Sequence, residues 1–115
     1  PPPVPHRGRG HHITVIMMIF FSKYLKTALH TASWNNKKEA VGALISHGAD
    51  INARMKDGIT PLMDASMRGH AQIVGILLAA GADKEMRNNT GETALDIARR
   101  CERWKVAEML VDDAV

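Results

Sequence analysis

The chain has 115 residues, of which 45% are hydrophobic and 23% charged. This size and composition are typical of one small folded domain and argue against a disordered chain. The formal net charge of +3 raises the possibility of nucleic-acid binding, so the positions of the basic residues matter.

The excess of basic residues lies in the N-terminal segment. Up to Lys26 the chain contains Arg7, Arg9, Lys23 and Lys26 and no Asp or Glu. Removing these four leaves 11 basic against 12 acidic residues from Thr27 onward, a net charge of about −1. We therefore expect no nucleic-acid binding, because a neutral body gives little counterion release.

Residues 1–26 form a leader that precedes the rest of the chain. Its apolar run, Ile13–Phe21, is well under the roughly 18–20 residues that span a bilayer. The run faintly resembles a signal peptide but lacks a small-residue cleavage site, and a buried N-terminal cap is the alternative. Contact of the basic, apolar leader with an anionic membrane also stays open.

Three histidines of the leader could bind a transition metal, but we favour a solvated tail and expect no metal or cofactor, because no Cys or acidic residue accompanies His6, His11 and His12.

A single cysteine, Cys101, excludes an internal disulfide. A lone thiol is more typical of a reducing compartment than of a secreted protein. We expect an intracellular protein, cytoplasmic or nuclear, with an ordinary unreactive thiol.

Residues 33 positions apart match along most of the chain, as expected for a repeat architecture. In the middle unit, Thr60 and Pro61 predict a helix start, Gly69 a break, and Gly81 the end of a second helix. Asp57-Gly58 predicts a hairpin turn between units. Small residues at helix contacts would let neighbouring units stack closely. The matched positions are Thr27, Thr60 and Thr93; Leu29, Leu62 and Leu95; Ala32, Ala65 and Ala98; Leu44, Leu77 and Leu110; Gly48 and Gly81; and Gly58 and Gly91.

These units resemble the ankyrin repeat, whose signature is T-P-L-H-x-A in a unit of 33 residues. The matching stretches are Thr27–Ala32, Thr60–Ala65 and Thr93–Ala98. The resemblance implies an all-α fold, a solenoid of helix-turn-helix repeats with short β-hairpin loops. It divides residues 27–115 into units 27–59, 60–92 and 93–115. The third unit is either a C-terminal capping repeat or a truncated repeat, and its polar helices favour the cap.

Two units depart from the pattern at the turn between paired helices. Asn36 replaces the glycine found at Gly69 and can adopt left-handed geometry. Glu102 stands there in the third unit, so we expect that turn to be strained or reshaped.

Catalytic chemistry is not expected. His30, Ser66 and Asp96 are the residue types of a catalytic triad, but repeat stacking would place His30 and Asp96 on the order of 20 Å apart. The resemblance gives His30 a structural role, in which its hydrogen bonds brace the turn. Asn52 occupies a loop position that some intracellular hydroxylases modify in ankyrin repeats, and we favour structural hydrogen bonding there.

The resemblance implies that a partner protein binds the concave side, formed by the loop tips and the outer edges of the first helices. Trp and Arg often dominate interface energies, and Met adapts to irregular surfaces. For Trp34, packing against the leader is an equal alternative. We expect a monomeric interaction module for an acidic or mixed protein surface; the alternative is an adaptor tethered to a membrane by its leader. The predicted partner-binding residues are Trp34, Asn35, Arg54, Lys56, Asp57, Ile59, Met67, Arg68, Arg87, Asn89, Thr90, Glu92 and Arg100.

Overall fold

A computed structural model describes residues 23–111 of the chain, so the expectations for the first 22 residues and for Asp112–Val115 lie outside it. A helix covers residues 23–34. The elements that follow it are α2 (Lys38–Ser46), the short 3-10 helix η1 (Lys56–Gly58), α3 (Pro61–Arg68), α4 (Ala71–Ala79), α5 (Ala94–Arg100) and α6 (Trp104–Leu110). Within the described residues there is no strand.

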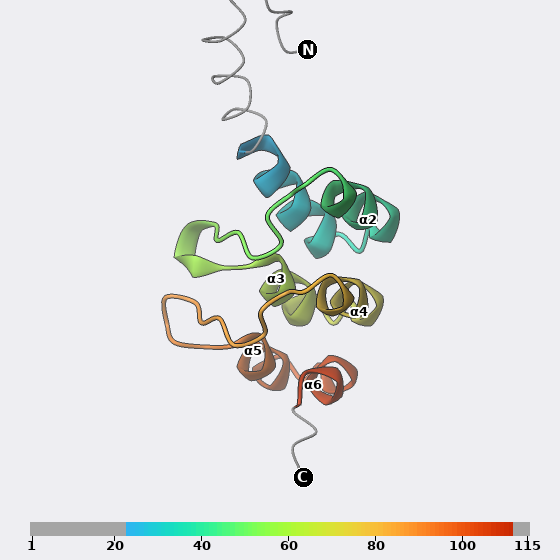
Figure 1. Ribbon diagram of the computed structural model, residues 1–115. Helices are drawn as coiled ribbons and strands as arrows, with labels where there is room; N and C mark the ends of the chain where they lie inside the picture. Colours follow the sequence, from blue (N-terminus) through green and yellow to red (C-terminus); the bar gives the residue numbers. More distant parts are fainter. Residues whose placement is uncertain (1–22, 112–115) are drawn as a thin grey trace, which may run out of the picture.

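The helices form a stack of antiparallel pairs (Figure 1). Within pairs, α3 packs on α4 and α5 on α6; between pairs, α3 packs on α5, α2 on α4, and α4 on α6. The predicted all-α repeat solenoid is therefore confirmed. The loops at residues 47–60 and 80–93 project to the same side of the stack, beside α3 and α5.

Side-chain caps begin α3 and α5 where the sequence predicts them. Thr60 precedes Pro61, and its hydroxyl oxygen accepts a hydrogen bond from the backbone N–H of Met63 at 3.3 Å. Thr93 and Asp96 form a reciprocal capping box, with bonds of 3.2 and 3.0 Å. Local chemistry thus fixes the first residue of both helices.

The first described helix begins upstream of Thr27, the residue in register with the helix cap Thr60. Residues 23–26 are already helical, and the Thr27 hydroxyl donates to the Lys23 carbonyl at 3.3 Å inside the helix. Ala28 replaces proline here, and no turn residue separates Thr27 from Tyr24–Lys26, so nothing stops the helix from extending upstream. The expected boundary between leader and repeats therefore falls within a helix.

The turns inside all three pairs have the same left-handed geometry. Gly69 has φ 74°, Asn36 φ 59° and Glu102 φ 58°. The tolerance expected of Asn36 is confirmed. The turn at Glu102 is not reshaped but strained, because a left-handed non-glycine residue costs roughly 1–2 kcal/mol.

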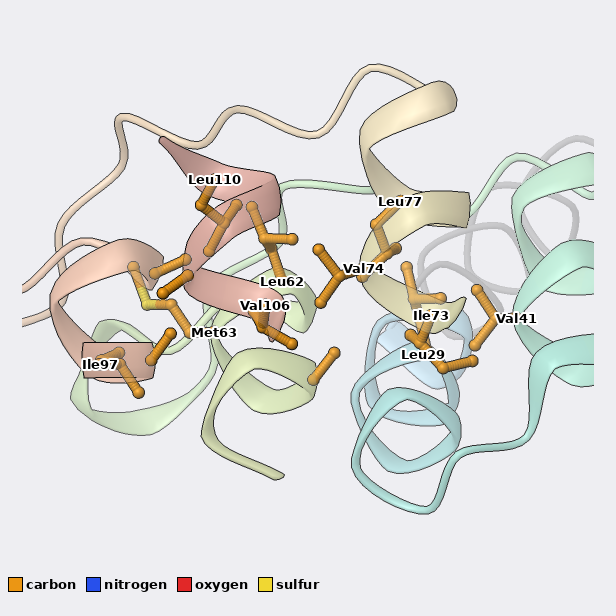
Figure 2. Packing of buried hydrophobic residues seen from close by; sticks show 14 of the residues in the cluster. Leu29, Val41, Leu62, Met63, Ile73, Val74, Leu77, Ile97, Val106 and Leu110 are labelled. Atoms are coloured by element: carbon orange, nitrogen blue, oxygen red, sulfur yellow. The ribbon is translucent and has the colours of Figure 1, made fainter. Parts of the chain in front are cut away.

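A continuous apolar core runs through the stack (Figure 2). Leu29, Leu62 and Ile97 are buried in successive first helices, and Val41, Leu77 and Val106 in the second helices. Small side chains lie at the expected contacts, since Ala32, Ala65 and Ala98 are all buried.

Hydrogen bonds between units repeat with the period of the sequence. His70 Nε2 lies 2.9 Å from the Trp34 carbonyl oxygen, and 33 residues later Arg103 Nε donates to the Met67 carbonyl at 3.0 Å. Each bond joins the start of one second helix to the end of the preceding unit's first helix. The units are therefore held in register by polar contacts as well as by the core.

Candidate functional site

The predicted partner-binding residues lie on the loops and at the ends of the first helices. Trp34 ends the first described helix and Asn35 follows it, Met67 and Arg68 end α3, and Arg100 ends α5. The first loop carries Arg54, Lys56, Asp57 and Ile59, and the second carries Arg87, Asn89, Thr90 and Glu92. The helix pairing brings these segments to one side of the stack (Figure 1).

Trp34 and Arg68 form a contact between successive units. The Arg68 guanidinium carbon lies 4.7 Å from the centroid of the Trp34 ring, within cation–π range. Trp34 is half-buried and Arg68 is exposed. The indole is therefore held by its neighbours yet reaches the surface, and the alternative contact with the leader lies outside the described residues.

Beside this pair lies a hollow of about 330 Å³ between the first helix, the first loop and α3. Its walls combine apolar side chains with a carboxylate and a lysine. Its volume is at the lower end of the range for ligand sites. The lining residues are His30, Thr31, Trp34, Asn35, Met55, Lys56, Ile59 and Asp64.

His30 fixes the shape of this hollow. Its Nδ1 lies 2.8 Å from the Lys26 carbonyl oxygen and its Nε2 lies 2.9 Å from the Ile59 carbonyl oxygen. The ring is buried. His30 thus ties the first loop to the first helix, and the predicted structural role is confirmed.

Asp64 on α3 was missed by the sequence reasoning. Its side chain is half-buried in the hollow, and burial raises its pKa from 3.8 to about 6, an effect that the charge of His30 opposes. Within residues 23–111 its carboxylate accepts no hydrogen bond and forms no ion pair. The available signal was helical spacing, because Asp64 precedes the predicted surface residue Arg68 by four positions.

The second loop uses several of its predicted contact residues to hold itself. Arg100 Nε lies 2.8 Å from Glu92 Oε2, and this hydrogen bond is the main cause of the lowered pKa of Glu92. Arg87 donates to the Gly91 carbonyl at 2.8 Å, and the Thr90 N–H donates to Asn88 Oδ1 at 3.0 Å. These groups are partly committed within the chain, whereas Arg54 and Lys56 on the first loop are exposed.

The two loops also contact each other. Asn52 Oδ1 accepts a hydrogen bond from the Asp83 N–H at 2.8 Å, and Asn89 donates its N–H to the Asp57 carbonyl at 2.9 Å. The favoured structural role of Asn52 is confirmed. Asp57 takes a left-handed φ of 70°, and the Met55 N–H donates to the Ile59 carbonyl at 2.8 Å, which closes the loop as a hairpin does.

The side chains of the rejected catalytic triad, His30, Ser66 and Asp96, make structural hydrogen bonds. The Ser66 hydroxyl donates to the Leu62 carbonyl at 2.7 Å, and Asp96 caps α5. Cys101 is a half-buried free thiol. Among residues 23–111 no cluster of His, Cys, Asp or Glu could hold a metal ion, and no helix there is long and apolar enough to cross a membrane.

A larger hollow of about 940 Å³ lies at the N-terminal end of the stack, between the first described helix and α2. Its lining is largely apolar and includes Tyr24, Ala28, Ala40 and Leu44. This is the end of the stack that the predicted cap, Ile13–Phe21, would cover, and that segment lies outside the described residues.

A family model for ankyrin repeats, in three copies, matches residues 29–115. The chain belongs to the ankyrin repeat family. It is 37% identical over 94 residues to an ankyrin repeat protein of Fowlpox virus (strain NVSL), a match that covers 77% of this chain and 28% of the viral protein. It is 35% identical over 94 residues to an ankyrin repeat and KH domain-containing protein of Caenorhabditis briggsae, covering 80% of this chain and 4% of that protein.

Ankyrin repeats are generally protein–protein interaction modules and are typically not enzymes. The chain spans about a quarter or less of the length of the relatives above. The family thus establishes the class of module, while the binding face and the partner are separate questions.

Proposed function

We propose that this chain binds a partner protein on the face formed by its loop tips and first-helix ends, here called the loop face. The contact between Trp34 and Arg68 carries the proposal, because it places a half-buried indole and an exposed guanidinium side by side next to a hollow. Trp and Arg are the residues most enriched at the energetic centres of interfaces.

The surroundings of this pair also favour binding. Met67 is half-buried beside Arg68 in the chain, and Ile59 adds apolar surface to the hollow. Arg54 and Lys56 extend the surface with exposed positive charge. An apolar centre with a charged rim is the usual organisation of a protein interface.

The test compares capture of proteins from native lysate by the immobilised chain and by a variant carrying Trp34→Ala, Met67→Ala and Arg68→Ala. We expect specific capture by the parent chain and at least a tenfold loss in the variant. The matched control is Lys38→Ala, Gln72→Ala and Lys105→Ala, which alters exposed residues on α2, α4 and α6. Equal capture by both variants, with helical circular dichroism retained, would refute the loop face.

The membrane-tethered alternative depends on residues outside those described and stays a prediction, as does an intracellular location. Its measurement is sedimentation with anionic liposomes before and after deletion of residues 1–22. Loss of sedimentation on deletion would support tethering, and no sedimentation of the parent chain would exclude it.

A further inference from the structure

The hollow on the loop face contains the Asp64 carboxylate, which has no hydrogen-bond or ion-pair partner among the described residues. Asp64 lines this hollow together with the apolar side chains of Trp34, Met55 and Ile59. The hollow therefore offers a partner one carboxylate acceptor, Asp64, beside apolar side chains.

Each class of partner side chain would interact differently with this arrangement. An apolar side chain would desolvate Asp64 further and leave it unpaired, which costs roughly 1–3 kcal/mol. An acidic side chain would add charge repulsion. A lysine or arginine matches both features, since its aliphatic stem packs on apolar walls while its cationic head pairs with a carboxylate.

The charges around the hollow restrict the segment that carries this cation. Lys56 from η1 lines the hollow, while Arg54 and Arg68 are exposed nearby on the first loop and α3. His30, from the first described helix, interacts electrostatically with Asp64 and lowers its pKa. A run of basic residues would be repelled at this surface, whereas acidic residues on either side of one basic residue would be attracted.

We propose that the hollow at Asp64 receives a single lysine or arginine side chain from a partner segment that carries acidic residues on both sides of it. This inference rests on the proposed loop face and names the chemistry of its central contact. It narrows the acidic or mixed surface expected from the sequence to one pattern, acidic–basic–acidic.

The energetic cost of Asp64 to the free protein supports this assignment. Burial raises the pKa of Asp64 to about 6, so the ionised form that exists at neutral pH is disfavoured in the fold. A neutral asparagine would avoid that cost. Groups that destabilise the free protein often belong to binding sites, where a ligand supplies the missing partner.

The test is an NMR titration of the full chain with two synthetic peptides. One has a central arginine flanked by glutamates, with glycine spacers; in the other, norleucine replaces the arginine and keeps the stem without the charge. Near neutral pH we expect the arginine peptide to bind at least fivefold more tightly and to shift the resonances of Trp34 and Ile59. In Asp64→Asn this preference should fall to about onefold.

The matched control is Glu39→Gln, which removes an exposed carboxylate on α2, outside the loop face, and should keep the preference. Lowering the pH to about 5 should reduce it in the parent chain, because Asp64 becomes protonated. Equal binding of both peptides, a preference that survives Asp64→Asn, or no shift up to about 10 mM peptide would each overturn the proposal. If the peptide test fails but the variant of Trp34, Met67 and Arg68 still loses capture, the proposed loop face is retained and only the role of Asp64 is rejected.

Discussion

Arg68 and Trp34 join two successive repeats, with the guanidinium carbon 4.7 Å from the centroid of the indole ring. Because the contact is partly exposed, we expect a coupling free energy of about 0.5–1 kcal/mol in a double-mutant cycle. The cycle uses Trp34→Leu, Arg68→Ala and the double variant, with urea unfolding as the measurement. The control combines Arg68→Ala with Trp104→Leu, since Trp104 is an exposed side chain on α6, and the effects of these two substitutions on the unfolding free energy should be additive. A coupling near zero for the first pair would mean that the stacking contributes nothing.

Asp64 should make the stability of the fold depend on pH. Its pKa rises from 3.8 to about 6 on folding, so the native state binds more protons than the unfolded state between these values. The free energy of unfolding therefore decreases as pH rises through this window and stays lower above it. Asp64→Asn should stabilise the protein by about 1–2 kcal/mol near pH 7.5, less than the full shift implies because the side chain is partly solvated.

The same substitution should have little effect near pH 3, where the carboxyl group is mostly protonated in both states. Urea unfolding at both pH values measures the difference, and Asp57→Asn serves as the control for removal of an acidic charge. A constant gain at both pH values would show that ionisation of Asp64 is not the cause.

Gly58 should not tolerate a side chain. It has φ 76°, and an added Cβ would lie 2.8 Å from Asn89 Oδ1 and 3.2 Å from the Asn88 Cα of the neighbouring loop. We expect Gly58→Ala to lower the unfolding free energy by about 2–3 kcal/mol, combining backbone strain with displacement of the second loop. Gly81→Ala isolates the strain, because Gly81 has φ 98° and open space around it, and should cost only about 1 kcal/mol. Equal losses for the two variants, measured by thermal unfolding, would show that the loops do not pack tightly.

Ser33 has a fully buried hydroxyl that finds no hydrogen-bond partner within the described part of the chain. We expect Ser33→Ala to stabilise the protein by about 1 kcal/mol, because an unsatisfied buried polar group is removed without a large cavity. Ser66, the equivalent residue of the next repeat, donates to Leu62 at 2.7 Å, so Ser66→Ala should instead be neutral or destabilising. Denaturation midpoints of the two variants would decide, and a destabilised Ser33→Ala would contradict the expectation.

Helix ends and turns were predictable wherever the determining residues are close in the chain. Thr60 with Pro61, and Thr93 with Asp96, cap helices through bonds across three residues. Gly69 closes α3 in the left-handed conformation. The start of the first helix was not predictable from the repeat, because the register suggested a boundary at Thr27 that the local residues do not enforce.

The sequence by itself determined the family, the stacking period and the apolar positions of the core, because these depend on spacing along the chain. Only the tertiary structure shows which surface groups pair with other residues of the chain and which remain exposed to solvent. Arg100 and Glu92, eight residues apart, pair with each other, and Arg68 stacks on Trp34 from the preceding repeat. Asp64 becomes half-buried only where the first loop, held by His30, closes beside α3. Burial and charge environment depend on what surrounds a side chain in space, and the residues that line the hollow with Asp64 come from two other segments, the first helix and the first loop.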